Sequence, residues 1–239
     1  MANKVILKAS DGTTVEFYDE IKAQGGVKDV YFSTDKTYVV AFYRDPLNVN
    51  DKERVKNIVG TYRERIFTNT PDGQYWKNLF PWPSKMVEWN GKTGIVMPFY
   101  DKKFFFNGGP FDGKEKNGKW FASAKLRNRF IPADQKGNWL THLHLCIKIA
   151  RAIRRLHAAG LAHSDLSYNN VLIDPITGSA CVIDCDSLVV PGKFPPEVVG
   201  TPDFIAPEVM ATRHLKVGDP NKKLPSIYTD RHALAVLIY

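Results

Sequence analysis

The stretch from His163 to Asp174 constrains this chain more than any other. It reads His-Ser-Asp-Leu-Ser-Tyr-Asn-Asn-Val-Leu-Ile-Asp, a short polar loop that runs directly into an apolar segment. A second apolar segment follows and ends in Asp184. The loop offers one carboxylate that can orient an attacking hydroxyl, Asp165. An amide and a second carboxylate, Asn170 and Asp184, can hold Mg²⁺. Phosphoryl transfer from a nucleotide requires this combination of groups.

The order, spacing and flanks of these residues resemble those of the protein-kinase family, whose catalytic loop reads H-R-D-L-x-x-x-N and whose metal motif reads D-F-G. The resemblance implies that Asp165 is the general base, and that Asn170 and Asp184 bind Mg²⁺ or Mn²⁺ together with ATP. It also implies that Leu172 forms the floor of the adenine site. Ser167 stands where protein Ser/Thr kinases generally have a lysine near the transferred phosphate.

Two later segments indicate the kind of acceptor. Residues 200–208 resemble the peptide-binding segment that ends in A-P-E, where Thr201 is expected to bond the base. Residues 228–236 resemble the kinase helix in which an aspartate, here Asp230, braces the catalytic loop. These segments favour Ser/Thr of a protein substrate. Ser167 and the sequence Asp-Cys-Asp in place of D-F-G favour the alternative, a small-molecule kinase.

The segment before the first long strand resembles the glycine-rich loop that covers the phosphates in kinases. Setting Val30 on the valine of G-x-G-x-x-G-x-V puts Gly25 on the second glycine and places Gly26 beside it. Ala23 and Lys28 replace the other two glycines. A plain β-turn explains the two remaining glycines equally well. Lys28 either adds a cation near the phosphates or points to solvent.

The next strand departs from the family at its most informative position. By alternation, Val39 and Ala41 share one face, so that Val39 contacts adenine and Ala41 stands where V-A-I-K has its lysine. Ala41 is either native, as in a pseudokinase or an unusual kinase, or an engineered lysine-to-alanine change. The retained base and metal residues favour the engineered form, with impaired activity. Arg44 faces the other side of the strand and is a poor substitute.

An amphipathic helix is expected over residues 50–69 and corresponds to the regulatory helix of kinases. The acid that pairs with the missing lysine is assigned to Glu64, with Glu53 as the alternative. Gly60 inside this helix costs about 1 kcal/mol relative to alanine.

Strands are expected over residues 81–89 and 93–99, on either side of an Asn-Gly turn. The second strand resembles the one that leads into the kinase hinge. On that alignment Met97 is the gatekeeper, and adenine bonds the carbonyl of Pro98 and the amide of Tyr100.

These observations predict an α+β, bilobal kinase-like fold. A β-rich N-lobe with one regulatory helix spans residues 1–97. The hinge and a helical C-lobe span residues 98–239. The C-lobe includes a basic, glycine- and aromatic-rich insertion over residues 101–139 and a long helix over residues 140–160. Because the chain stops within a helix, the C-lobe is expected to be incomplete, as in a truncated form. The chain looks most like bacterial Ser/Thr kinases of the eukaryotic-like type, in the subgroup associated with tellurite resistance.

Composition narrows the partners and the compartment. The net charge of +8 over 239 residues favours anionic partners. Nothing resembles a nucleic-acid module, so nucleic acid is not an expected partner. The three cysteines have neither disulfide nor zinc spacing, and no run reaches the ~20 apolar residues of a membrane span. A cytoplasmic protein is expected. Its partners would be a protein substrate and, for a pseudokinase scaffold that binds nucleotide, a phosphatase or another scaffold partner.

Overall fold

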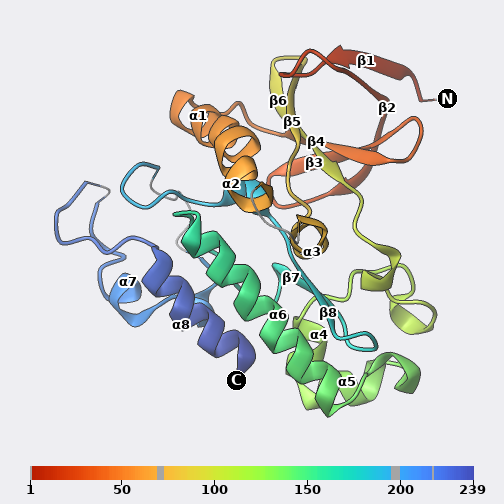
Figure 1. Ribbon diagram of the computed structural model, residues 1–239, viewed down its shortest axis with the longest axis vertical. Helices are drawn as coiled ribbons and strands as arrows, with labels where there is room; N and C mark the ends of the chain where they lie inside the picture. The colour runs from red at the N-terminus through yellow and green to blue at the C-terminus, as the bar shows by residue number, and fades with distance from the viewer. Residues whose placement is uncertain (1, 69–72, 195–199, 217) are drawn as a thin grey trace. The chain divides into compact units, whose positions relative to one another are not determined.

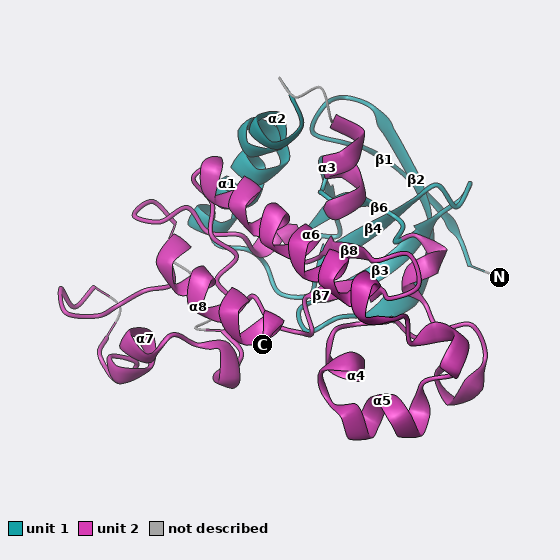
Figure 2. Cartoon of the chain, turned by 60° about the horizontal axis from the view of Figure 1, so that its bottom comes forward, with its two compact units in different colours: residues 1–69, 81–100 teal, residues 70–80, 101–239 magenta. Residues whose placement is uncertain are grey.

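The computed structural model describes residues 2–68, 73–194, 200–216 and 218–239. The chain forms two compact units (Figure 2). Unit 1 comprises Met1–Asn69 and Pro81–Tyr100, and unit 2 comprises Thr70–Phe80 and Asp101–Tyr239. A short segment between two parts of unit 1 therefore belongs to unit 2.

Unit 1 is built on a six-stranded antiparallel sheet with the strand order β1-β2-β3-β4-β6-β5 (Figure 1). The strands are β1 (Lys4–Lys8), β2 (Thr14–Gln24), β3 (Lys28–Ser33), β4 (Tyr38–Tyr43), β5 (Lys85–Trp89) and β6 (Lys92–Pro98). The expected turns are confirmed. Gly12 has φ 81° between β1 and β2, and Asn90 and Gly91 have φ 50° and 74° between β5 and β6. The last two values suit the tight turns that favour Asn-Gly.

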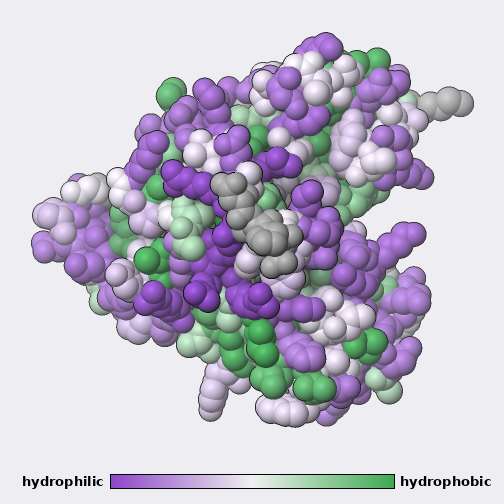
Figure 3. All heavy atoms as spheres, viewed as in Figure 1, coloured by the Kyte–Doolittle hydropathy of each residue, from purple (hydrophilic) through white to green (hydrophobic). Residues whose placement is uncertain are grey.

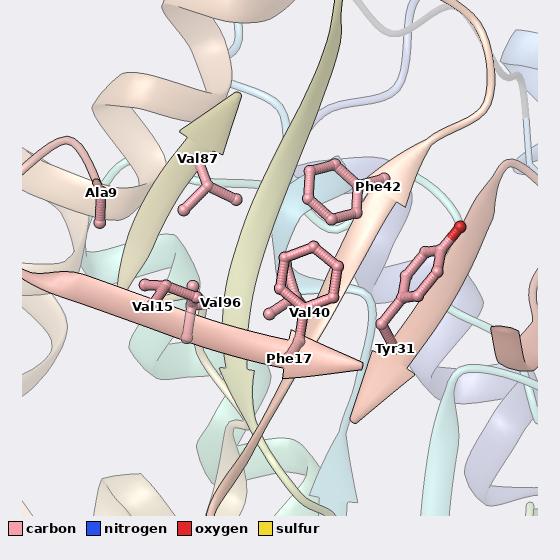
Figure 4. Packing of buried hydrophobic residues seen from close by; sticks show 8 residues of the cluster. All are labelled: Ala9, Val15, Phe17, Tyr31, Val40, Phe42, Val87 and Val96. Atoms are coloured by element: carbon pink, nitrogen blue, oxygen red, sulfur yellow. The ribbon is translucent and has the colours of Figure 1, made fainter. Parts of the chain in front are cut away.

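Each face of this sheet has its own apolar cluster, as strand alternation requires. One cluster contains Phe17 and Phe42, which are 0% and 2% exposed, together with buried side chains from β2 to β6 (Figure 4), and Val5 and Leu7 of β1 pack against it. Trp89 packs edge-on against Phe17, with ring centroids 5.2 Å apart. The other cluster contains Ala41, Ile95 and helix residues. The sheet is therefore covered on the second face by the helical segment.

That segment begins as α1 (Val49–Asn57), continues through a π-helical turn at Ile58–Tyr62 and ends as α2 (Arg63–Phe67). The sequence predicts one helix here but not the π turn. The carbonyl of Ile58 accepts both the backbone N–H of Arg63 and, at 2.8 Å, the indole N–H of Trp82. Gly60 weakens the α-helix at the same place. Asn69, the last residue of the expected helix, lies outside the described residues.

Unit 2 contains the long helix α6 (Trp139–Ala158) and the hairpin of β7 (Val171–Asp174) and β8 (Ser179–Val182). The helices α3 (Gly73–Leu79) and α8 (Ile227–Ile238) both contact α6. Helix α6 was predicted over residues 140–160. It starts with a capping box at Asn138, and Gly160, with φ 83°, follows its end. In the described part of the chain, no helix has the length and apolar character that crossing a membrane requires.

The basic segment 101–139 carries local structure. It contains α4 (Lys119–Ala122), α5 (Ala124–Phe130) and short 3-10 turns. Phe106 is 3% exposed and contacts the rings of Phe111 and Phe121. Lys116 is 5% exposed; its ammonium lies 3.8 Å from Asp174 Oδ1 and donates to a backbone carbonyl at 3.1 Å. Aromatic burial and one buried ion pair thus order this basic segment.

The remaining helix, α7 (Pro207–Ala211), precedes α8. Apolar side chains remain exposed along α6 and α8, and Figure 3 shows hydrophobic atoms over these two helices. On α6 the exposed fractions of Leu143 and Ile147 are 44% and 47%, and on α8 those of Val236 and Ile238 are 39% and 41%. An apolar surface of this kind is common where another chain segment or protein binds.

Two glycine substitutions test the packing of unit 1. A Cβ at Gly94 on β6 would lie 2.6 Å from two ring atoms of Phe42. We expect Gly94→Ala to lower the free energy of unfolding by about 1–3 kcal/mol, since overpacking a core is destabilising. A Cβ at Gly60 meets nothing within 4 Å. Gly60→Ala serves as the matched control and should raise stability by up to about 1 kcal/mol. Urea denaturation measures both. Equal effects of the two substitutions would contradict this account of the sheet.

Candidate functional site

The loop between α6 and β7 is held by a single buried carboxylate. Asp230 on α8 is 2% exposed. Its Oδ2 accepts the backbone N–H of His163 at 2.7 Å, and its Oδ1 accepts that of Ser164 at 3.1 Å. His157 on α6 lies with Nε2 3.0 Å from Oδ2. Ser164 has φ 63°, a conformation that non-glycine residues rarely adopt, so these bonds hold the loop in a strained shape.

The carboxylate of Asp165 is oriented from two sides. The hydroxyl of Thr201 donates to Oδ1 at 2.7 Å. The side-chain amide of Asn170 donates to Oδ2 at 3.1 Å and to the backbone carbonyl of Asp165 at 2.8 Å. The contact expected between Thr201 and the base is confirmed. Asp165 is half-buried. Such a group can accept a proton or a hydrogen bond from a substrate hydroxyl.

The chain brings Asn170 and Asp184 to the same end of the β7–β8 hairpin. Asn170 immediately precedes β7, and Asp184 follows β8 by two residues. The backbone N–H of Ile183 donates to the carbonyl of Asn170 at 3.0 Å, which joins the two segments. His163 Nε2 lies 3.0 Å from the carbonyl of Ile183 and ties the catalytic loop to the same point. Asp184 has φ 62°, so its backbone turns sharply just where its carboxylate is presented.

The chemistry of these donors fits a magnesium site. Mg²⁺ prefers oxygen ligands, often one or two from the protein with the rest from phosphates and water. The amide nitrogen of Asn170 is engaged with Asp165, so its carbonyl oxygen is the atom left to bind a cation. Asp184 follows Ile183, whose N–H bonds the backbone carbonyl of Asn170, and adds a carboxylate to the same end of the hairpin.

The other predicted residues of unit 2 are buried. Ser167 is 0% exposed, and its hydroxyl accepts the backbone N–H of Asn169 at 3.3 Å. Its observed contact stabilises the turn of the loop. Leu172 on β7 is 0% exposed and forms a backbone bridge with Asn117. Cys185, which was expected to be a small buried residue, is 1% exposed.

In unit 1 the turn between β2 and β3 is held by a hydrogen bond within the turn and by contacts from Arg44, which follows β4. The backbone N–H of Gly25 donates to the carbonyl of Lys28 at 2.9 Å. Arg44 donates its backbone N–H to the carbonyl of Val27 at 3.0 Å, and its guanidinium reaches the carbonyl of Gly26. The same guanidinium lies 3.5 Å from Asp29. Arg44 was not predicted as part of this loop, because the contact depends on the strand register.

Register also places the residues expected around adenine. Val30 pairs with Ala41 across β3 and β4, and Val39 pairs with Met97 across β4 and β6. Val39 is 8% exposed, whereas Val30 and Met97 are partly exposed. Pro98, the last residue of β6, is exposed. Tyr100 lies just beyond the strand and is partly exposed.

The curated proteins that are similar in sequence are protein kinases. A dual serine/threonine and tyrosine protein kinase of Apis mellifera is 27% identical over 144 residues, which are 54% of this chain and 14% of that protein. The dual specificity testis-specific protein kinase 1 of Rattus norvegicus is 35% identical over 82 residues, which are 30% of this chain and 13% of that protein. Each match thus spans a small part of the relative. No protein-family profile matches the chain.

Solved kinase structures match nearly the whole chain. A Toxoplasma gondii specific rhoptry antigen kinase domain superposes with a TM-score of 0.62 at 15% identity, covering 99% of this chain and 69% of that one. Vaccinia related kinase 3 gives 0.60 at 12% identity, covering 98% and 66%. The chain has the protein-kinase fold. A further match, with a TM-score of 0.59 at 15% identity and coverage of 100% and 67%, is a Toxoplasma gondii virulence factor described as having this fold and no enzymatic activity.

In the kinase fold a lysine on the third strand of the sheet pairs with a glutamate on the regulatory helix. Here Ala41 is 1% exposed and packs with Val55 and Val59 of the helical segment. Glu64 lies in α2 with an exposed side chain. Glu53 is also exposed and accepts the side-chain amide of Asn57 at 3.0 Å. The helix therefore presents apolar residues to Ala41.

The sequence motifs do not indicate one residue that helps to hold the loop between α6 and β7. His157 bonds the carboxylate that holds this loop. The signal available was its place in the last turn of a long helix that leads into the loop. The identity of its partner, 73 residues away, depends on how α6 and α8 pack.

Removing the brace should unfold the loop. We expect Asp230→Ala to lower the free energy of unfolding by roughly 3 kcal/mol or more, because two buried backbone N–H groups and His157 lose their partner. Asp230→Asn keeps an acceptor and should cost less. Asp203→Ala, at an exposed position of the same unit, is the control. Thermal unfolding followed by circular dichroism measures all three. A loss for Asp230→Ala no larger than for the control would contradict the role of the brace.

Proposed function

We propose that this protein transfers the γ-phosphoryl group of ATP, with Mg²⁺ or Mn²⁺, to serine or threonine hydroxyls of a protein substrate. The observation that carries the proposal is the orientation of Asp165 by Thr201 and Asn170, while Asn170 and Asp184 lie at one end of the same hairpin. One carboxylate for the hydroxyl and two oxygen donors for a cation are the minimum that phosphoryl transfer requires.

Each residue then has a defined task. Asp165 accepts a hydrogen bond from the substrate hydroxyl and aligns its oxygen for attack on phosphorus. Asn170 and Asp184 hold the cation, which neutralises charge on the phosphates when bound. Thr201 fixes one carboxylate oxygen and belongs to the segment that is expected to receive the peptide.

Unit 1 supplies the nucleotide contacts of the proposal. The adenine would lie against Val30, Val39 and Met97, with the Pro98 carbonyl and the Tyr100 amide as its hydrogen-bonding partners. Leu172 is proposed as the floor of the adenine site on the kinase resemblance alone. The turn at Gly25 and Gly26 covers the phosphates. The apolar strand residues suit a flat purine, and a backbone carbonyl followed by an N–H suits its polar edge.

The acceptor is proposed from the chemistry of the loop and from the relatives. Both curated relatives are described as dual kinases or dual-specificity kinases, so tyrosine is an acceptor to be tested beside serine and threonine. The hydroxyl of Ser167 holds a turn of the loop. Because this serine replaces the lysine that protein Ser/Thr kinases generally have here, a small-molecule acceptor is the alternative. We place the protein in the cytoplasm, among bacterial eukaryotic-like kinases, on its motifs.

A second candidate function is a kinase-fold scaffold that binds nucleotide or a partner protein. The observation that favours it is Ala41 at the lysine position, since loss of a phosphate-binding cation impairs transfer. The solved virulence factor with this fold and no enzymatic activity is a precedent. The exposed apolar residues of α6 and α8 suit such a partner, and a phosphatase is one class to test.

The two functions differ in their response to one substitution. We expect Asp165→Asn to lower ATP turnover and phosphorylation of a generic protein substrate by about 10²–10⁴-fold, the usual contribution of a positioned acid–base group. Affinity for Mg²⁺-ATP should stay unchanged, because Asp165 orients the hydroxyl. Asp184→Asn should weaken Mg²⁺-dependent ATP binding as well.

Asp134→Asn is the matched control, since Asp134 is exposed in the same unit and lies outside the loop and the peptide-binding segment. Its turnover should equal that of the native chain. A native chain that binds ATP but shows no turnover above Asp165→Asn, with protein or metabolite acceptors, would favour the scaffold.

A further inference from the structure

The position of the missing lysine and the helix that packs on it are both apolar. Ala41 is 1% exposed, and Val55 beside it is 0% exposed. A lysine at position 41 would need a carboxylate partner, because an ammonium in an apolar cluster loses its hydration. An engineered lysine-to-alanine change would leave that carboxylate behind. The two candidate acids, Glu64 and Glu53, are both exposed and the cluster around Ala41 is apolar, which fits a chain in which Ala41 is the native residue.

The next cation along the same strand is engaged elsewhere. Arg44 lies with its guanidinium 3.5 Å from Asp29 and in contact with the carbonyl of Gly26. Asp29 pairs in register with Phe42, whose side chain belongs to the cluster on the other face of the sheet. Arg44 therefore holds the turn from the face opposite Ala41.

Lys28, by contrast, lies on the face of Ala41. It opens β3 and pairs with Tyr43, while Val30 pairs with Ala41. Residues two apart on a strand share a face, so Lys28 lies next to Val30 on that face and two pairs along from Ala41, about 7 Å away along the strand. Its ammonium lies 5.4 Å from the ring centroid of Tyr43, which belongs to the Ala41 cluster. The side chain is partly exposed and within reach of a ligand.

We propose that Lys28, on β3, is the phosphate-binding cation of this protein. It would take the role of the lysine that kinases carry on the strand corresponding to β4 of this chain. The inference rests on the proposed function, since it assigns the ATP site of that function. Lys28 would bind anionic oxygens of the triphosphate as a point charge. It neither makes nor breaks a covalent bond. The chain then carries a complete set of charges for transfer and is active as it stands.

The local structure prepares Lys28 for this role. The N–H of Gly25 fixes its carbonyl at 2.9 Å, and the ring of Tyr43 limits where its ammonium can lie. A Cβ at Gly26 would meet nothing within 4 Å, so the packing of the chain does not itself demand glycine there. Glycine at this turn leaves the backbone open to a phosphate beside Lys28.

The test compares phosphate-dependent with phosphate-independent binding. Isothermal titration of Mg²⁺-ATP and of adenosine is carried out on the native chain, on Lys28→Met and on Lys36→Met. Lys36 is exposed in the turn at the other end of the same hairpin and is the control. We expect Lys28→Met to weaken ATP binding at least tenfold, leave adenosine binding unchanged and lower turnover about 10²-fold, the usual cost of one transition-state donor. Lys36→Met should change none of these.

A compensating change sharpens the result. Ala41→Lys added to Lys28→Met should restore part of the ATP affinity and turnover. Lys28→Arg, which keeps a cation on β3, should retain ATP binding. Melting temperatures confirm that each variant folds. The proposal is overturned if Lys28→Met binds and turns over ATP like the native chain. The result is clearest if, in addition, Ala41→Lys alone raises turnover tenfold. A native chain that binds ATP through Lys28 without turnover would refute phosphoryl transfer and keep the site. A native chain that binds no ATP overturns both.

Discussion

The buried carboxylate of Asp230 is the interaction on which the functional half of the molecule depends. It accepts two backbone N–H groups of a loop whose residue Ser164 is in a left-handed conformation. The bonds to Asp165 and the bridge from His163 to the end of β8 all start from the backbone fixed in this way. The geometry of this loop is thus set from a helix more than sixty residues downstream, through backbone atoms that any sequence would have.

Much of this could be predicted because local rules and global packing agree. Strand alternation and the Asn-Gly turn gave the β5–β6 hairpin, and the long apolar stripe from Leu143 to Leu156 with a terminal glycine gave α6. The catalytic loop was recognisable because its polar residues have fixed spacing. Its contact with Thr201 could be expected because the peptide-binding segment has a signature of its own.

What could not be predicted depends on register and on competing hydrogen bonds. The π turn arises because the indole of Trp82, from a distant segment, shares the carbonyl of Ile58. The surroundings of Ala41 required the pairing of three strands and the rotation of a helix. Once this pairing is known, Ala41 is seen to be one half of an apolar contact with Val55, and not only a position that lacks the expected lysine.

The buried pair of Lys116 and Asp174 has a consequence for how the chain could diversify. The segment 101–139 is rich in basic, glycine and aromatic residues. Here its lysine neutralises a carboxylate 3% exposed at the end of β7. A shorter segment would leave that charge uncompensated inside the protein. The inserted segment and the β7–β8 hairpin therefore depend on each other through this ion pair. Homologues should gain or lose the lysine and the aspartate together.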